Sequence, residues 1–300
     1  MSKTPEAPEL VDIDTALKRF AFPNNITQSS DHIRRLHWYT ACRLVIEGGF
    51  DPGRVVPRPP FKVVKRAKRT FLHHDPLEAK AGERTVLGGL KTKQVDVTVS
   101  LPGIGPVLAI SLKGTHNAFR NLTNRMEEAA GDCTNLHMAY PALVYGFWHV
   151  LRANEESDPA PFAHFALGAD GYKPADLALM RDGSLAEGVE RYAHALDRLS
   201  DRDDLRDHPS RYEACGLTLV KVVGGPASCG IHPAFPSPDT VLDFNRLFRR
   251  LYTLYDQRFV HQAPSLASRT RRLEWDPESP VLRDTILSGG AFDEMQPRIG

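Results

Sequence analysis

Two neighbouring predicted strands carry the polar side chains of this chain that could do chemistry. Asp96 lies on the polar face of the first strand, residues 94–100, in which apolar and polar residues alternate. Ser111 and Lys113 share one face of the second strand, residues 107–113, because side chains two residues apart in a strand point the same way. A carboxylate and a lysine under a sheet cost free energy that an apolar residue would avoid. This pattern therefore indicates a site for a metal ion and a water molecule.

The spacing between Asp96 and the run Ser111–Lys113 resembles a known enzyme fold. With a predicted order of helix, strand, strand, helix and strand, it is similar to the PD-(D/E)XK nuclease fold of type II restriction endonucleases over about residues 31–152. Two positions depart from the usual motif, since Val95 replaces a proline and Ser111 replaces an acid. Some tetrameric restriction endonucleases carry Ser-x-Lys on this strand and have moved the missing carboxylate onto the following helix.

The resemblance therefore assigns a second metal ligand to that following helix. Glu127 and Glu128 lie there, and spacing favours Glu127, fourteen residues after Lys113. The family also often places a glutamate on the helix ahead of the sheet, where Glu47 is the matching residue. A carboxylate at a helix C-terminus is destabilised by roughly 0.3–1 kcal/mol, so a metal ion or an arginine beside Glu47 would explain its position.

These residues would hydrolyse a phosphodiester bond with the help of Mg²⁺, for which Mn²⁺ is expected to substitute. Mg²⁺ prefers oxygen ligands, here the carboxylates of Asp96 and Glu127, the backbone carbonyl of Leu112 and a phosphate oxygen. Lys113 would orient or deprotonate the attacking water and offset charge on the phosphorane. The resemblance thus implies a Mg²⁺-dependent endonuclease of double-stranded DNA, most simply a sequence-specific type II restriction enzyme with a cognate methyltransferase in the same system.

A strongly basic segment lies directly ahead of these strands. Residues 54–69 hold seven cationic residues and no acidic one, which is typical of a surface that follows DNA phosphates. Ser111 and His116 are expected to contact the DNA as well, and the arginines within residues 269–272 form a weaker second patch. The seven cationic residues are Arg54, Arg58, Lys62, Lys65, Arg66, Lys68 and Arg69.

Plainer explanations exist for each of these features. Asp96 and Lys113 could form a cross-strand salt bridge, worth about 0–1 kcal/mol if exposed. Glu127 and Glu128 could lie on a solvated helix face, and the basic segment could be a solvated edge. The rival functions are a nuclease of the same fold that reads no sequence, serving repair or phage defence, and an inactive nucleic-acid-binding module, which Ser111 makes conceivable.

A second possible metal site surrounds two adjacent histidines. His73 and His74 are followed by Asp75, Glu78 and Glu83. Adjacent histidines rarely bind one ion in a loop, and no second histidine cluster completes the set. We therefore do not expect a transition metal there.

Hydrophobic periodicity predicts an α/β protein with a central mixed β-sheet flanked by helices. Helical spacing over residues 31–47 and 117–132 brackets the predicted strands, and a short strand is predicted at 85–90. The aromatic- and valine-rich run 142–151 favours a buried strand, which completes a restriction-endonuclease-like core of order α-β-β-β-α-β. Later elements are expected at residues 184–199 (helix), 217–223 (strand) and 240–260 (amphipathic helix).

The domain organisation follows from composition. Residues 1–30, rich in proline, acid and asparagine, predict an arm with one short helix near 13–20. For residues 31–300 the resemblance then implies a single nuclease domain, whose catalytic core at about 31–152 is followed by a recognition or dimerisation part at about 160–300. Cutting both strands of a duplex is most simply done by two sites related by a two-fold axis, so a homodimer or a dimer of dimers is expected. The helix at 240–260 is the candidate contact, because it has more apolar surface than one buried stripe requires.

The overall composition excludes several classes of protein. The 300 residues are 41% hydrophobic and 25% charged, which rules out disordered, collagen-like and coiled-coil chains. Since 38 Lys+Arg oppose 37 Asp+Glu, attraction to DNA must come from local clusters of charge. No apolar run approaches the roughly 20 residues that a bilayer requires, and the four cysteines are scattered. We therefore expect a soluble, cytoplasmic protein.

Overall fold

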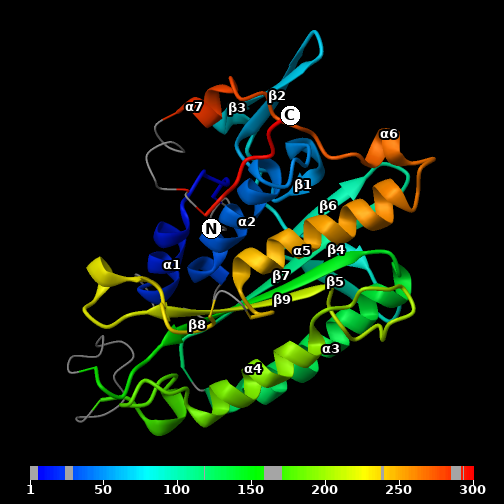
Figure 1. Ribbon diagram of the computed structural model, residues 1–300. Coiled ribbons are helices and arrows are strands. Elements are labelled where there is room, and N and C mark those ends of the chain that lie inside the picture. Colours follow the sequence, from blue (N-terminus) through cyan, green and yellow to red (C-terminus); the bar gives the residue numbers. More distant parts are fainter. Residues whose placement is uncertain are drawn as a thin grey trace, which may run out of the picture.

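A six-stranded mixed sheet organises the chain, in the strand order β1-β6-β7-β8-β9-β10 (Figure 1). The central strands β7, β8 and β9 are parallel to one another, and the outer pairs are antiparallel. The strands are β1 (Val55–Val56), β6 (Val97–Leu101), β7 (Gly105–Thr115), β8 (Val144–Ala153), β9 (Ala214–Lys221) and β10 (Gly230–Ile231). This computed structural model describes residues 6–23, 30–117, 119–158, 171–237, 240–284, 292 and 294–300.

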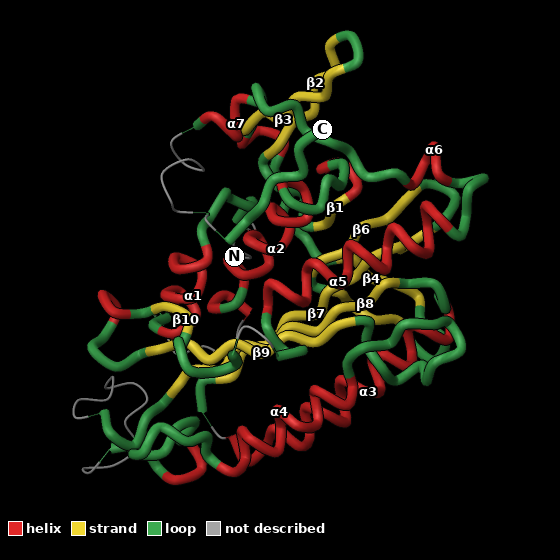
Figure 2. The backbone as a smooth tube through the Cα atoms, in the orientation of Figure 1, coloured by secondary structure: helices red, strands yellow, loops and turns green. Residues whose placement is uncertain are grey.

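Helices cover both faces of this sheet (Figure 2). On one face pack α1 (Ile13–Ala21), α2 (Arg34–Ile46) and α5 (Phe244–Asp256), whose apolar side chains share a core with Leu108, Ile110 and Leu112 of β7. On the other face lie α3 (Leu122–Ala139) and α4 (Glu187–Leu199), which share a second core with Ala109 and with alternate residues of β8. The chain is thus an α/β protein with helices on both faces of a mixed sheet, as the sequence predicts at this level.

Two hairpins and several short helices complete the fold. The first hairpin pairs β2 (Phe61–Arg66) with β3 (Arg69–His74), and the second pairs β4 (Arg84–Leu87) with β5 (Thr92–Val95). A π-helical turn, Gln257–His261, continues α5. The other short helices are Ser30–His32, Pro52–Arg54, Pro76–Glu78, Phe119–Asn121, Pro174–Asp176, Pro226–Ser228, α6 (Ala267–Thr270) and α7 (Pro280–Arg283).

The strand predicted at residues 94–100 is interrupted at Asp96. Val95 packs in the core beneath α3, whereas Val97 and Val99 pack in the core beneath α2, so the single apolar face predicted for all three is wrong. The physical reason is that β5 pairs with β4, whereas β6 pairs with β1 and β7. The chain changes sheets at Asp96, which places this side chain at a junction between strands.

Two further expectations change in the folded chain. Leu247 and Leu251 of α5 are fully buried against the sheet, so the helix at 240–260 is a core element and the surplus of exposed apolar surface expected on it is wrong. Leu17 and Phe20 of α1 are also fully buried in the main core, so this part of the predicted arm belongs to the packed domain. Among the described residues, no helix has the length and apolar character needed to cross a membrane.

Candidate metal site and nucleic-acid surface

Asp96 is held at the junction of β5 and β6 by the backbone of the neighbouring strand. Its Oδ2 accepts a hydrogen bond of 2.8 Å from the backbone N–H of Leu112. Its Oδ1 lies 3.8 Å from Nε2 of His37, which projects from α2. One oxygen of this carboxylate is therefore fixed by the sheet, while the other faces a polar space between the sheet and α2.

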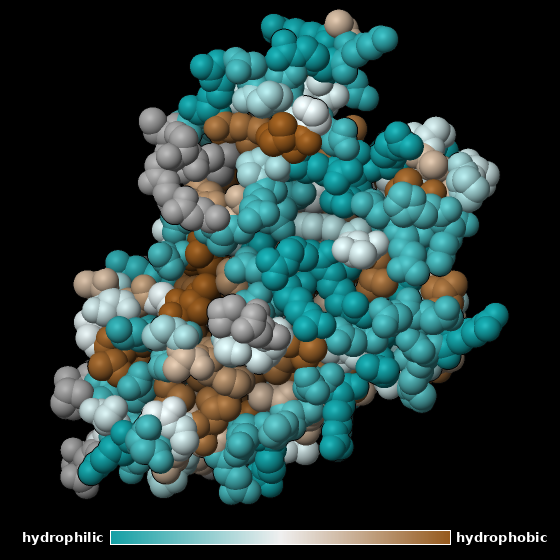
Figure 3. Space-filling view, viewed as in Figure 1, coloured by the Kyte–Doolittle hydropathy of each residue, from teal (hydrophilic) through white to brown (hydrophobic). Residues whose placement is uncertain are grey.

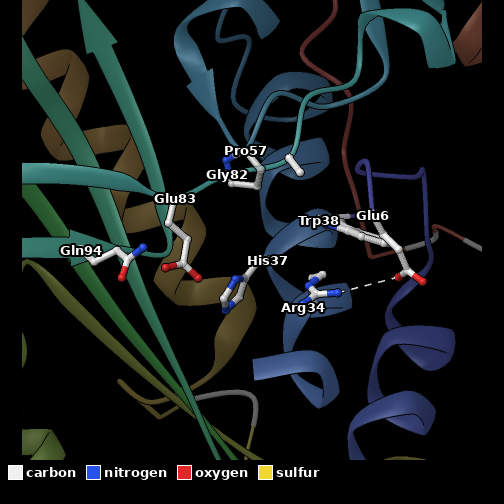
Figure 4. Close-up of a pocket in the computed structure, with 9 residues that line it drawn as sticks. Glu6, Arg34, His37, Trp38, Pro57, Gly82, Glu83 and Gln94 are labelled. Atoms are coloured by element: carbon white, nitrogen blue, oxygen red, sulfur yellow. Dashed lines mark ion pairs between the residues drawn. The ribbon is translucent and has the colours of Figure 1, made fainter. Parts of the chain in front are cut away.

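Three potential metal ligands meet in this space. One ligand atom from each of His37, Glu83 and Asp96 lies within 4.8 Å of the other two, a spacing that one metal ion could bridge. Figure 4 shows the Glu83 and His37 side chains pointing toward each other across the pocket. The ligands come from α2, from the residue ahead of β4 and from the β5–β6 junction.

The imidazole of His37 fits a metal ligand better than a structural residue. His37 is 5% exposed, and its Nε2 is buried without a hydrogen-bond partner among the described residues. Burial lowers the pKa of His37, against the opposing charge of Asp96 and with the help of Lys113, which favours the neutral ring that binds metals. A buried ring nitrogen without a partner costs free energy that a bound cation would recover.

Glu83 is exposed, and its carboxylate has no hydrogen-bond or ion-pair partner in the part of the chain that the structure describes. Partial burial raises the pKa of Glu83, the nearby Asp96 raises it further, and Lys113 and Arg34 oppose the shift. Two carboxylates this close repel each other, which a cation between them would relieve. The donor set and its electrostatics therefore fit a divalent metal ion.

Lys113 stands beside this cluster without an ion-pair partner among the described residues. It lies on the same face of β7 as Ser111, as predicted, while Leu112 packs into the opposite core. Lys113 follows Leu112, whose backbone N–H binds Asp96, and its charge acts on the pKa of both His37 and Glu83. The described ion pairs include no Asp96–Lys113 salt bridge, which was the plainer alternative for these two residues.

The predicted second ligands lie elsewhere. Glu47 forms an ion pair with Arg43, the arginine that its helix position required, and its backbone lies about 15 Å along α2 from His37. Glu127 is exposed on α3 and is not part of the metal-competent group in the described chain. Glu128 accepts a hydrogen bond of 2.9 Å from Arg125. Burial raises the pKa of Glu128, but the bond from Arg125 and the charge of Lys113 outweigh it, so the pKa is lowered.

Two of the residues predicted to contact DNA make hydrogen bonds within the protein instead. Ser111 is 2% exposed, and its hydroxyl shares a hydrogen bond with Tyr145 at 2.9 Å. His116 stacks on the ring of Phe20, and its Nε2 bonds the Phe20 carbonyl oxygen at 2.7 Å. Burial lowers the pKa of His116 to about 4, so its ring is neutral. Neither side chain is placed to bind a phosphate.

The basic segment divides into free and neutralised cations. Arg58 is paired with Glu78, and Arg69 with Asp276, so a phosphate would have to compete with these carboxylates for either arginine. The remaining hairpin cations are exposed, and the β2–β3 hairpin projects from the body as a hydrophilic arm (Figures 1 and 3). These exposed cations are Lys62, Lys65, Arg66 and Lys68.

A polar pocket of about 400 Å³ opens in front of the cluster. His37 and Glu83 line it together with Arg34 and Gln94. The guanidinium of Arg34 pairs with Asp31 and lies 3.9 Å from Glu6 (Figure 4). The pocket thus borders two of the three ligand residues and carries one arginine beside them.

Sequence reasoning reached Asp96 and Lys113 but missed His37 and Glu83. His37 lies within a predicted helix with no motif around it, and Glu83 was grouped with the histidines of residues 73–74. Only the packing of α2 against the β5–β6 junction brings them to Asp96. Comparison with protein-family models, curated proteins and solved structures finds no match.

Proposed function

We propose that this protein is a divalent-metal-dependent endonuclease that cleaves double-stranded DNA. The observation that carries the proposal is the cluster of His37, Glu83 and Asp96, with the unpaired Lys113 beside it, at the mouth of a polar pocket. Two carboxylates, a neutral imidazole and a lysine are the groups that metal-assisted phosphodiester hydrolysis needs.

The donor set favours Mn²⁺ over Mg²⁺. The sequence-based expectation of Mg²⁺ assumed oxygen ligands alone, but His37 adds a nitrogen. Imidazole binds later divalent metals more tightly, whereas Mg²⁺ prefers oxygens and gives up water reluctantly. A bound cation would lower the pKa of its water and offset negative charge on the phosphate. We propose Mn²⁺ as the better cofactor, with Mg²⁺ supporting weaker activity.

Each residue of the candidate site has a distinct role in this proposal. The Leu112 N–H fixes one oxygen of Asp96, so the carboxylate is oriented before a metal arrives. Glu83 and His37 supply the remaining protein ligands. Lys113 is near enough to affect the pKa of Glu83 and is free to hold the attacking water or the charged phosphorane.

The order of elements supports the same proposal. An antiparallel pair, β6 and β7, is followed by α3 and then by β8, parallel to β7, which agrees with the order expected from the restriction-endonuclease resemblance. The short β4 departs from that order, because it pairs with β5 outside the six-stranded sheet. The family resemblance is also what favours sequence-specific cutting by a homodimer or a dimer of dimers.

The β2–β3 hairpin supports DNA as the substrate. Its exposed cations lie on a narrow two-stranded arm, a shape that a major groove admits. Attraction to phosphates would position the protein, while base contacts would set any sequence preference.

Incubation of the purified protein with supercoiled plasmid and Mn²⁺, Mg²⁺ or EDTA tests the function. Discrete bands with metal support a restriction enzyme, and a smear supports a nuclease that reads no sequence. A mobility shift without cutting would support the binding module instead, and full cutting in EDTA would exclude metal-dependent hydrolysis.

A further inference from the structure

A second, smaller pocket lies where two distant parts of the chain meet. It has a volume of about 180 Å³, is floored by Val99 and Leu101 of β6, and is walled by residues 49–54 and 268–273. Pockets for organic ligands of drug size usually exceed about 300 Å³. This pocket therefore suits one small group rather than a whole nucleotide.

The charge of the pocket is strongly positive. Four arginines line it, whereas Asp51 is its one acidic lining residue, and the Asp51 carboxylate caps the Gly53 N–H. The arginines are Arg54, Arg269, Arg271 and Arg272.

Not all of these arginines are used within the protein. Arg272 is bound by Asp256 and by the carbonyl of Gly48, and Arg269 donates to the carbonyl of Pro102. Arg54 and Arg271 are exposed, and neither guanidinium has an ion pair or hydrogen bond with a described residue. Two guanidinium groups without a partner among the described residues therefore border one small pocket, and guanidinium groups suit the oxygens of a phosphate.

The pocket and the metal cluster border the same edge of the sheet. Arg54 directly precedes β1, the edge strand, and Pro57 directly follows it and lines the pocket of His37 and Glu83. The three residue steps from Arg54 to Pro57 span at most about 10 Å. Along the axis of B-form DNA, that distance corresponds to at most about three steps between successive phosphates of one strand.

We infer that the Arg54–Arg271 pocket is a binding subsite for one phosphate of a nucleic-acid strand, and that another phosphate of the same strand, a few nucleotides away, enters the metal cluster. The inference rests on the proposed nuclease function and adds to it a fixed contact, which joins the predicted basic segment to the C-terminal part of the chain. The edge strand β1 would then set the path of the bound strand between the two sites.

The test measures binding of a fluorescent 20-base-pair duplex in Ca²⁺ by anisotropy across a series of salt concentrations. The double variant Arg54→Ala, Arg271→Ala should bind about tenfold more weakly, as expected for loss of charged hydrogen bonds to one phosphate. The slope of log K against log salt should fall by about 0.9. The variant Arg54→Lys, Arg271→Lys should recover most of that slope, because lysine keeps the charge.

The matched control is Arg191→Ala, Arg198→Ala on α4, at the opposite end of the molecule from α6 (Figure 1). This control should bind like the unchanged protein. A pocket variant that binds and cuts like the control overturns the subsite and leaves the nuclease function standing. If the pocket variant loses binding as expected but the unchanged protein does not cut DNA, the subsite is supported and the nuclease function is overturned. If the unchanged protein binds no duplex, both are overturned.

Discussion

His149 lies in the middle of β8, on the same side of the sheet as Lys113. Its burial gives a quantitative test of how the fold changes the titration of a side chain. It is fully buried, its Nε2 shares a hydrogen bond of 2.9 Å with the Thr115 hydroxyl, and its Nδ1 bonds the Tyr192 hydroxyl. Burial lowers the pKa of His149 to about 3, with smaller contributions from the charges of Arg125 and Lys113. The folded chain therefore keeps this ring neutral.

The size of the effect follows from this pKa. The unfolded chain binds a proton on this ring near its ordinary pKa of 6.5, whereas the folded chain does so only near 3. Between those values the unfolded state holds more protons, so stability falls as pH falls. From pH 7 to pH 4.5, His149 alone should lower the free energy of unfolding by about 2.5 kcal/mol.

Urea denaturation at both pH values measures this loss for the unchanged protein and for His149→Gln, which cannot titrate. The loss on acidification should be about 2.5 kcal/mol smaller in His149→Gln, although this variant starts from a lower stability at pH 7. The matched control is His194→Gln, which removes an exposed imidazole from α4 and should lose as much as the unchanged protein. Equal losses in all three proteins would refute the burial argument.

Three further outcomes follow from the structure. Glu213→Gln should lower the free energy of unfolding by about 3–5 kcal/mol, because the fully buried carboxylate accepts hydrogen bonds of 2.6 Å from both Arg202 and Arg258. A loss below 1 kcal/mol in urea denaturation would contradict this. Lys113→Ala should slow plasmid cleavage roughly 10²–10⁴-fold and leave Mn²⁺ affinity within about threefold, and parallel losses of both would show that Lys113 supports the metal site instead. Replacing Lys62, Lys65, Arg66 and Lys68 by alanine should lower the salt slope of DNA binding by up to about 3.6, whereas Arg69→Ala, already paired with Asp276, should hardly change it.

The local elements could be predicted because their signals are local. Helix α2 and strand β8 fall within one to three residues of the ranges that periodicity predicts. The sharing of one face by Ser111 and Lys113 follows from strand geometry alone, and the hairpin pairs their strand with the one that follows Asp96. These features depend on residues close together in the chain.

The rest depends on tertiary packing or on unusual turns. The break at Asp96 arises because β5 and β6 pair in different sheets, which no alternation pattern reveals. The β2–β3 hairpin turns through Ala67 at a φ of 53°, without the glycine or asparagine that marks such turns. Helix α5 looked too apolar for one buried stripe because the sheet, α2 and the C-terminal residues enclose much of its surface.

The predicted acid on α3 shows the limit of spacing arguments. Glu127 lies on the intended helix, yet the carboxylate that meets Asp96 is that of Glu83, ahead of β4. Glu47 lies on the intended helix too, but another residue of that helix, His37, faces Asp96. The elements were therefore predicted better than the side chains they contribute.

Titration of Mn²⁺ into the protein, followed by electron paramagnetic resonance, tests the central claim most directly. The unchanged protein and the matched control Glu127→Gln should each bind one ion per chain with equal affinity. Glu83→Gln and Asp96→Asn should each bind roughly 100-fold more weakly, because each loses a carboxylate from a three-ligand site. Full Mn²⁺ affinity in Glu83→Gln, together with its loss in Glu127→Gln, would contradict the site and restore the acid on α3 as the ligand.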